Sequence, residues 1–265
     1  MRNERSLDAL CAALAYAMGI EPPRQAEAAC EELIKFVDEK LGGRKADRVF
    51  MYNPDAIGQW VYEKYADVFK TIKARAGVEI PFCSVVPPVT PVCFATMYTG
   101  AQPEVHGIRK YEKPVLRIDT LFDALIRAGK KPVIVGYGKC SLTNIYLERE
   151  MDYFVYDSVP EVNAKAAELI LQDEYDFIVV YNGNFDSTMH HNGPESAVAI
   201  GELGANAMAF STFAELIKKH WKNHDTLMGF AMDHGCHEID SGGSHGLDID
   251  EDMNIVHLYE AYPKR

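Results

Sequence analysis

The sequence predicts an α/β protein with a doubly wound, mostly parallel sheet sandwiched between helices. Seven short apolar runs are spaced along the chain, and they are continuous rather than alternating, as in strands covered on both faces. Segments with helical spacing lie between these runs, and such alternation is typical of doubly wound folds. The chain has 265 residues, 48% of them hydrophobic, so it can bury a sizeable core without a disulfide or a structural metal.

Each element follows from its local pattern. Two helices are expected first, one from Ser6 to Met18 and one that starts at Pro22-Pro23 and ends at Gly42-Gly43. The apolar runs that follow are predicted strands over 48–53, 78–86, 132–137, 152–157, 176–182, 226–232 and 254–260. Helices are expected between them over 56–76, 91–99, 119–129, 158–173 and 194–222. A boundary near Gly43 would separate an N-terminal helical extension (1–45) from a catalytic domain (46–265).

Charge and cysteine use exclude several classes of function. The net charge of −12 argues against binding to a nucleic-acid polymer or an anionic membrane, and no run approaches the ~20 apolar residues of a membrane span. Six scattered cysteines without metal-binding spacing are typical of reduced thiols in a cytoplasmic protein. The first apolar residues have helical spacing and are interrupted by Asp8, which favours an amphipathic helix over a signal peptide.

Residues that can do chemistry follow five of the predicted strands. These residues are Asp55, Thr90, Gly138-Lys139, Asp186 and Asp233-His234. Open α/β sheets place their sites at the carboxyl ends of the strands, so these residues are expected to meet at one edge of the sheet.

The histidines indicate a metal site at that edge. Seven of the nine lie between His190 and His245, and most of these are beside aspartates in loops predicted over 185–196 and 232–248. Carboxylate and imidazole groups are ligands for divalent metals. We expect Asp55, Asp233 and His234 to hold one ion, and Asp186, His190 and His245 to hold a second. Three protein ligands per ion leave positions open for a substrate, and two such ions can clamp a phosphoryl group.

Thr90 is the candidate nucleophile. It follows a predicted strand, and Pro91 after it suits the first turn of a helix. The free N–H groups of a helix N-terminus favour bound phosphate, and coordination to a metal is one way to activate a hydroxyl group. Taken alone, Thr90 fits a simple helix cap better; its place beside the Asp and His residues favours the catalytic interpretation.

Together these segments resemble the type I phosphodiesterase/nucleotide pyrophosphatase family of the alkaline phosphatase superfamily, from about Val49 to Tyr259. The matching motifs are Thr99-Gly100, Pro103-Glu104 and His106-Gly107-Ile108 after Thr90, then Asp186, His190 and Gly193-Pro194, then Asp233-His234-Gly235, and finally Gly243-Ser244-His245-Gly246. The resemblance implies an alkaline-phosphatase-like fold. It also implies that Thr90 acts as nucleophile and metal ligand, and that a small phosphate ester, such as a nucleotide, is hydrolysed through a phospho-threonine intermediate.

The sequence departs from the family pattern at two positions. Cys93 stands where the family carries a phosphate-binding asparagine, so contacts to the substrate are expected to differ there, and Met189 replaces a glycine. Lys139 is similar to a phosphate-binding lysine of phosphopentomutases in the same superfamily, although an ordinary loop lysine is an equal interpretation.

These departures leave alternatives open. Besides a hydrolase using two divalent ions (Zn, with Mn or Fe as options), the sequence allows a phosphomutase or phosphomonoesterase and, less readily, a sulfatase or a non-catalytic metal-binding module. The N-terminal helices could also pack on another subunit in a homo-oligomer.

Overall fold

A central sheet of seven strands organises the molecule. This computed structural model describes residues 1–138 and 140–265. The strands of the sheet are β1 (Arg48–Pro54), β2 (Val78–Cys83), β3 (Pro132–Tyr137), β4 (Asp152–Tyr156), β5 (Phe177–Asn182), β6 (Thr226–Phe230) and β9 (Asn254–Tyr262). Their order is β2-β9-β6-β1-β5-β3-β4, and only β9 runs antiparallel to its neighbours. The predicted fold class and all seven predicted strands are therefore confirmed.

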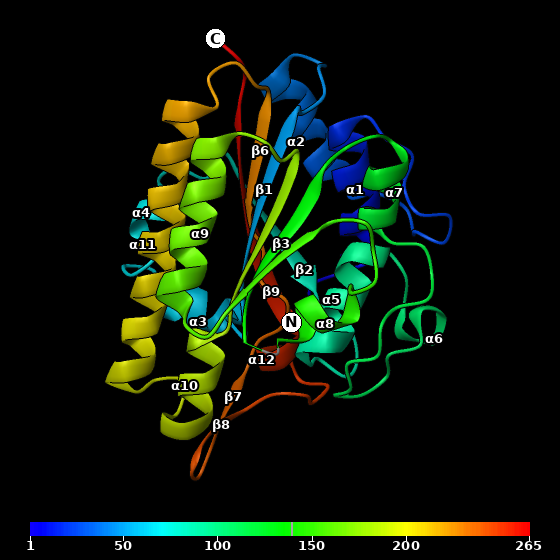
Figure 1. The fold of residues 1–265 in the computed structure, drawn as a ribbon. Helices are drawn as coiled ribbons and strands as arrows, with labels where there is room; N and C mark the ends of the chain where they lie inside the picture. The colour runs from blue at the N-terminus through cyan, green and yellow to red at the C-terminus, as the bar shows by residue number, and fades with distance from the viewer. Residues whose placement is uncertain (139) are drawn as a thin grey trace.

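Helices cover both faces of the sheet (Figure 1). One face carries α9 (Val159–Gln172) and α11 (Ala197–His220), while the other carries α1 (Ala9–Met18), α5 (Thr90–Thr99), α7 (Leu121–Arg127) and α8 (Ser141–Ile145). The remaining helices are α2 (Glu31–Leu41), α3 (Gln59–Lys64), α4 (Lys70–Lys73), α6 (Pro103–His106), α10 (Asn184–Asn192) and α12 (Asp250–Met253). A helix that crosses a membrane must be both long and apolar. The helix α11 has 24 residues but is not apolar enough, and none of the other described helices is long and apolar enough.

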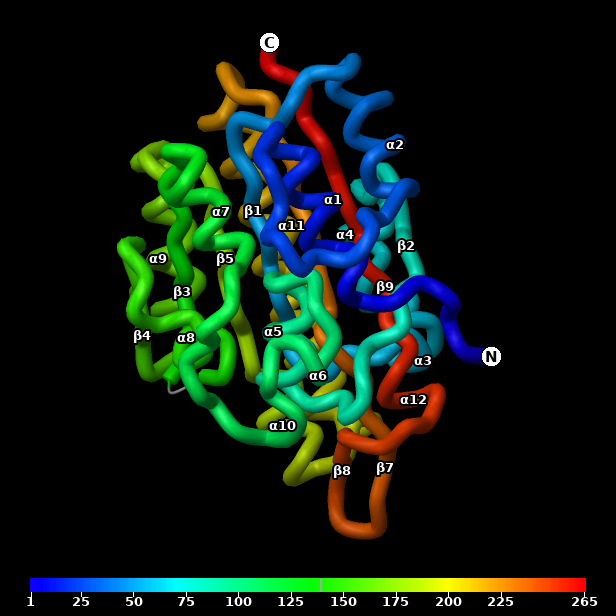
Figure 2. The backbone as a smooth tube through the Cα atoms, turned by 90° about the vertical axis from the view of Figure 1, so that its right-hand side faces the viewer, coloured from blue at the N-terminus to red at the C-terminus, as the bar shows by residue number. Residues whose placement is uncertain are grey.

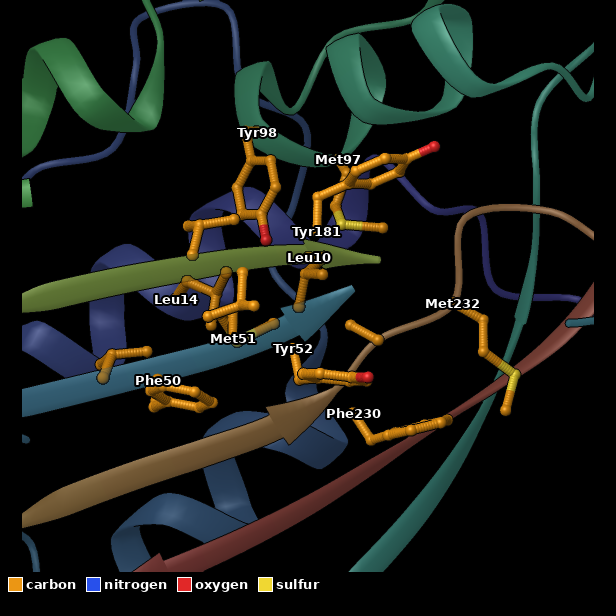
Figure 3. Close-up of a cluster of buried hydrophobic side chains, with 14 of the residues drawn as sticks. Leu10, Leu14, Phe50, Met51, Tyr52, Met97, Tyr98, Tyr181, Phe230 and Met232 are labelled. Carbon is orange, nitrogen blue, oxygen red and sulfur yellow. The ribbon is translucent and has the colours of Figure 1, made fainter. Parts of the chain in front are cut away.

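The core is built around the central strand β1 (Figure 3). The Phe50 ring lies 5.1 Å from the Phe213 ring of α11, and the Tyr52 ring lies 6.1 Å from that of Phe210. Since successive strand residues point to opposite faces, Met51 faces the α1 and α5 layer. Each such side chain contributes roughly 1.5–3 kcal/mol when fully buried, which makes this strand a firm support for the residues at its end.

The N-terminal helices share this core. Leu10 and Leu14 of α1 are fully buried in the same hydrophobic cluster as the strands, and Leu7 N donates to Cys83 O of β2 at 2.9 Å. The division at residue 45 into two units stays a prediction.

The second helix begins later than predicted. It starts at Glu31 rather than at Pro22-Pro23. The preceding segment instead packs against the end of α5, where Glu27 N donates to Gly100 O at 2.8 Å. Gly100 has φ +67°, and a Cβ there would lie 2.9 Å from Ala26 Cα, so the close packing requires glycine at this turn.

Three further expectations were wrong in detail. The helix expected over 56–76 is split into α3 and α4. The loop expected over 185–196 is largely the helix α10, and the loop expected over 232–248 contains a hairpin of β7 (His237–Ile239) and β8 (Gly242–Ser244). In both views α10, α12 and this hairpin lie together at one end of the molecule (Figures 1 and 2).

Candidate active site

The predicted strand ends meet at one edge of the sheet. Asp55 directly follows β1, Asp186 lies in the first turn of α10 after β5, and Asp233-His234 follow β6. Thr90 starts α5 after β2. The fifth predicted group ends at Lys139, which lies outside the described residues.

The first group consists of Asp55, Asp233 and His234, which are all buried. His234 Nε2 lies 3.3 Å from Asp55 Oδ1 and 3.3 Å from Asp233 Oδ2. Ala56 N donates to the other oxygen of Asp233 at 3.2 Å, which fixes the orientation of this carboxylate. The group therefore presents two carboxylate oxygens and one ring nitrogen to a common point.

The second group consists of Asp186, His190 and His245 and is partly exposed. Asp186 Oδ1 lies 3.2 Å from His190 Nε2 and 3.3 Å from His245 Nε2. Asp186 and His190 are four residues apart on α10, so the helix itself places them on one face. The His245 ring, 4.2 Å from the His234 ring between centroids, connects the two groups.

All three imidazoles are oriented by backbone carbonyl groups. Nδ1 lies 2.9 Å from Gly235 O in His234, 3.0 Å from Gly243 O in His190 and 3.2 Å from Pro88 O in His245. A carbonyl oxygen can only accept, so each Nδ1 carries a hydrogen and Nε2 is the nitrogen that faces the site; in the neutral ring Nε2 presents a lone pair there. This arrangement is typical of histidines that bind a metal through Nε2.

The donor set fits divalent metal ions. Asp55 Oδ1, Asp186 Oδ1 and Asp233 Oδ2 are buried oxygens with no hydrogen-bond partner among the described residues. Leaving a buried charged oxygen unpaired is costly, and a bound cation would remove that cost. Three carboxylates and three imidazole nitrogens are the hard and borderline ligands that Zn²⁺, Mn²⁺ or Fe²⁺ accept.

Thr90 lies beside the first group. Its Oγ1 is 3.3 Å from Asp55 Oδ2 and 3.3 Å from His234 Nε2, and its side chain is buried at the first turn of α5. The hydroxyl thus sits at the helix N-terminus and within reach of two of the ligand side chains, as the sequence predicts.

Burial and neighbouring charge shift the pKa values of the carboxyl groups in opposite directions. Burial, and then the charge of Asp186, raises the pKa of Asp55; burial, and then the charge of Asp55, raises that of Asp233. Burial alone would also raise the pKa of Asp186, but the neighbouring rings of His190 and His245 hold it below its usual range. The neighbouring carboxylate of Asp186 raises the pKa of His190. Without a cation, the site therefore favours proton uptake at buried carboxylates.

One segment of the chain matches a known protein family. Residues 52–124 match the model of the type I phosphodiesterase/nucleotide pyrophosphatase family. The predicted family resemblance is confirmed over this segment. The segment contains Asp55, Thr90 and Cys93, while the remaining five ligand candidates lie beyond it and are brought to Thr90 by the fold.

Solved structures of other proteins share the fold at low sequence identity. Murine ectonucleotide pyrophosphatase/phosphodiesterase 5 is similar with a TM-score of 0.58 at 17% identity, over 73% of this chain and 58% of the murine chain. Phosphonoacetate hydrolase from Sinorhizobium meliloti 1021 is similar with a TM-score of 0.55 at 18% identity, over 76% and 60%. The chain thus spans less than two thirds of either neighbour. No curated protein matches the sequence.

Two side chains that support the site were not predicted. The Tyr181 hydroxyl donates to Asp55 Oδ2. Asp252 is fully buried and accepts from Leu247 N at 2.9 Å and from His237 Nδ1 at 2.8 Å, which anchors the segment between His234 and His245. A strand-end tyrosine and an aspartate in an acidic stretch carry no local pattern that distinguishes them. The position of Tyr181 beside the predicted strand end was the one available signal.

Close backbone packing holds the two loops that carry the first group. Gly58 and Gly235 lie so close that a Cβ on Gly58 would be 3.0 Å from Gly235 Cα, and one on Gly235 would be 2.0 Å from Glu251 O. Gly235 N also donates to Asp252 O at 2.7 Å. A side chain on either glycine would push the Asp55 and His234 loops apart.

Cys93 and two histidines outside the ligand groups have defined surroundings. The Cys93 thiol is fully buried and lies 3.1 Å from Ser84 Oγ, whose hydroxyl donates to Asp233 O at 2.7 Å. Contact between Cys93 and a substrate stays a prediction. His106 and His257 are buried and hydrogen-bonded within the protein.

Proposed function

We propose that the protein is a two-metal hydrolase of phosphate esters, of the phosphodiesterase/nucleotide pyrophosphatase type, acting through a phospho-threonine intermediate. The observation that carries this proposal is the position of Thr90 Oγ1, 3.3 Å from both Asp55 Oδ2 and His234 Nε2 and next to a second three-ligand group. A lone hydroxyl beside two such groups has the arrangement that phosphoryl transfer to a side chain needs.

The metal assignment follows from the unpaired donor atoms. Asp55, Asp233 and His234 would hold one ion, with Thr90 as a further ligand, and Asp186, His190 and His245 would hold the other. Zn²⁺ suits this set best, and Mn²⁺ or Fe²⁺ are alternatives. When bound, such ions supply positive charge that stabilises the developing charge on phosphoryl oxygens.

The chain's own residues provide the nucleophile and its orientation. Thr90 Oγ1 loses its proton to solvent and forms a bond to phosphorus, while the bond to the leaving oxygen breaks and its electron pair departs with that oxygen. Water then attacks phosphorus and the bond to Thr90 breaks, which returns the proton to the hydroxyl and releases the product. The free N–H groups at the start of α5 favour binding of the phosphoryl oxygens in both steps.

The two neighbours support a small phosphorus-containing substrate. The murine structure is of an inactive threonine-to-alanine variant in complex with AMP, and the bacterial hydrolase is in complex with phosphonoformate. A nucleotide or another small phosphate ester is therefore the substrate class that we propose. The mutase alternative depended on Lys139, outside the described residues, and no described residue favours it.

The cysteines bear on the compartment of the protein. All six cysteines are free thiols, which supports a reducing compartment such as the cytoplasm. Assembly into a homo-oligomer stays a prediction.

Replacing the nucleophile tests the proposal. The Zn²⁺-loaded protein is expected to hydrolyse p-nitrophenyl phosphate or bis(p-nitrophenyl) phosphate, and Thr90→Ala is expected to lose at least 100-fold in kcat/KM. Acid quenching of the wild type, followed by mass spectrometry, should show phosphate on the peptide that contains Thr90. Thr212→Ala, at an exposed position of α11, is the matched control. Unchanged turnover by Thr90→Ala would exclude Thr90 as the nucleophile.

A further inference from the structure

A chain of buried polar side chains crosses the core next to the candidate site. The Tyr52 hydroxyl of β1 donates to Asn206 Oδ1 of α11 at 2.8 Å and accepts from Asn182 Nδ2, at the end of β5, at 2.6 Å. Each of these three side chains is at most 1% exposed. Asn206 is therefore an amide on a helix face whose other buried residues, such as Leu203 and Phe210, are apolar.

One end of this chain of hydrogen bonds reaches the second ligand group. Asn206 Nδ2 donates to Asn184 Oδ1 at 3.0 Å and to Glu202 O at 2.9 Å. Asn184 is the first residue of α10, and its own Nδ2 donates to Glu202 Oε2 at 2.6 Å. Because Asp186 and His190 lie on the same helix, α11 fixes the start of the element that carries two of the three ligand candidates of this group.

The other end reaches the first ligand group. Asp55 N donates to the backbone carbonyl of Asn182 at 3.1 Å, and Tyr52 lies three residues before Asp55. A path of hydrogen bonds therefore leads from Asp55 through Asn182 and Tyr52 to Asn206, and from there to Asn184. Asn206 is the link on α11, a helix that carries no ligand candidate, so it joins the supports of the two groups from outside both.

Stability alone is a poor explanation for this network. Asn182 Oδ1 is buried and has no hydrogen-bond partner among the described residues, and a buried polar atom without a partner is costly. Asn206 occupies a position at which an apolar side chain would match the neighbouring residues of its helix face. A buried polar network does, however, specify one arrangement of the elements that it joins, which apolar contacts do less strictly.

We propose that Asn206 is a positioning residue that holds α10 in place relative to β1 and so sets the spacing between the two ligand groups. The inference rests on the proposed two-metal hydrolase. Asn206 acts through Asn184 and Tyr52 rather than through a ligand side chain. Asp55 and Asp233 follow the paired strands β1 and β6, so the first group does not depend on α10, and loss of Asn206 should disturb the second group.

Binding of Mn²⁺ tests the proposal without an activity assay. The wild type should bind two Mn²⁺ ions per chain in calorimetric titration, and electron paramagnetic resonance should show the spectrum of a coupled pair. Asn206→Leu should weaken the second ion about tenfold, leave the affinity of the first within about twofold, and change the coupled spectrum. Asn184→Ala removes the contact by which Asn206 reaches α10 and should have the same effect. The double variant should be no weaker than either single variant, because both remove one connection.

Ile217→Ala is the matched control. It removes buried apolar atoms from the same helix and leaves the polar network in place, so it should lose stability in urea but keep both ions and the coupled spectrum. Asn184 is only partly buried, so its variant keeps the test available should Asn206→Leu fail to fold.

The outcomes separate this proposal from the proposed function. An unchanged second ion and an unchanged spectrum in Asn206→Leu and Asn184→Ala would overturn the positioning role, even where the wild type hydrolyses phosphate esters. Equal weakening of both ions, or the same losses in Ile217→Ala, would make Asn206 a purely structural residue and would also overturn that role. Selective weakening of the second ion together with no turnover by the wild type would support the positioning role and overturn the hydrolase.

Discussion

Tyr181 donates its hydroxyl hydrogen to Oδ2 of Asp55, the same carboxylate oxygen that lies 3.3 Å from the Thr90 hydroxyl. Hydrogen bonds of this kind orient a metal-ligating carboxylate, and their loss commonly costs 10–100-fold in metal affinity or activity. Tyr181→Phe should therefore weaken Zn²⁺ binding about tenfold in competition with a chromogenic chelator. Tyr175→Phe removes a similar bond to Asp152, a residue outside the candidate site, and serves as the control. Equal affinity in the two variants would show that Tyr181 does not orient Asp55.

Adjacent histidines on α10 provide a test of the second ligand group. His190 contacts Asp186 and His245, whereas His191 is exposed and its Nδ1 lies 2.8 Å from Ser187 O of its own helix. His190→Ala should reduce the bound metal from two ions to one per chain, measured by elemental analysis after gel filtration. His191→Ala should retain both ions. Two ions in His190→Ala would remove this residue from the ligand set.

The buried carboxylate of Asp252 should matter for stability as well as for metal binding. Asp252→Ala leaves Leu247 N and His237 Nδ1 without their acceptor, and bonds to a charged group are worth about 1.5–3 kcal/mol each. We expect the free energy of unfolding in urea to fall by about 3 kcal/mol and Zn²⁺ affinity to fall with it. Asp250→Ala, on the same helix, loses only solvent-screened ion pairs, so it should cost much less stability than Asp252→Ala. A similar loss in both variants would contradict the role of Asp252.

His106 should make stability depend on pH. Burial lowers its pKa to about 4, and Ile108 N donates to its Nδ1, so the folded protein holds the neutral ring. The unfolded chain binds a proton at about pH 6.5 and the folded chain does not, so stability falls as the pH decreases from about 6.5 to about 4. The contribution of this group is about 3 kcal/mol over that range.

The corresponding measurement compares His106→Gln with the wild type. In urea unfolding at several pH values between 7 and 4, the variant should lose less stability on acidification, and the difference should reach about 3 kcal/mol. Parallel curves for the two proteins would show that His106 does not titrate differently on unfolding. If the variant lost more stability than the wild type on acidification, the direction of the pKa shift would be contradicted.

The sheet could be predicted from the sequence chiefly because its central strands are buried on both faces. Runs such as 177–180 consist of side chains that are fully buried, so apolar character alone marks them. The helix α10 was missed because it lies beyond the end of the sheet and buries little apart from Phe185 and Met189. Its polar sequence is that of a loop by composition, although the four-residue spacing of Asp186 and His190 already had a helical period.

The ligand groups could be anticipated from their chemistry, and their supporting residues could not. Asp233-His234 follow a predicted strand and His245 lies in the glycine-rich sequence after them, which indicates a site at a sheet edge. The bond from Tyr181 to Asp55 and the contacts of Asp252 depend on how separate segments pack. No local spacing encodes them, so only the three-dimensional arrangement identifies these residues.

The contact between Gly58 and Gly235 has a consequence for genetic screens. Neither residue has a side chain that could touch a substrate, yet almost any replacement would displace Asp55 or His234. A random-mutagenesis screen for loss of activity would therefore recover both glycines as often as the reacting groups themselves. Such a screen would recover variants in which the loops are displaced together with variants that lack a reacting group. Assays of folding would be needed to distinguish the two kinds of variant.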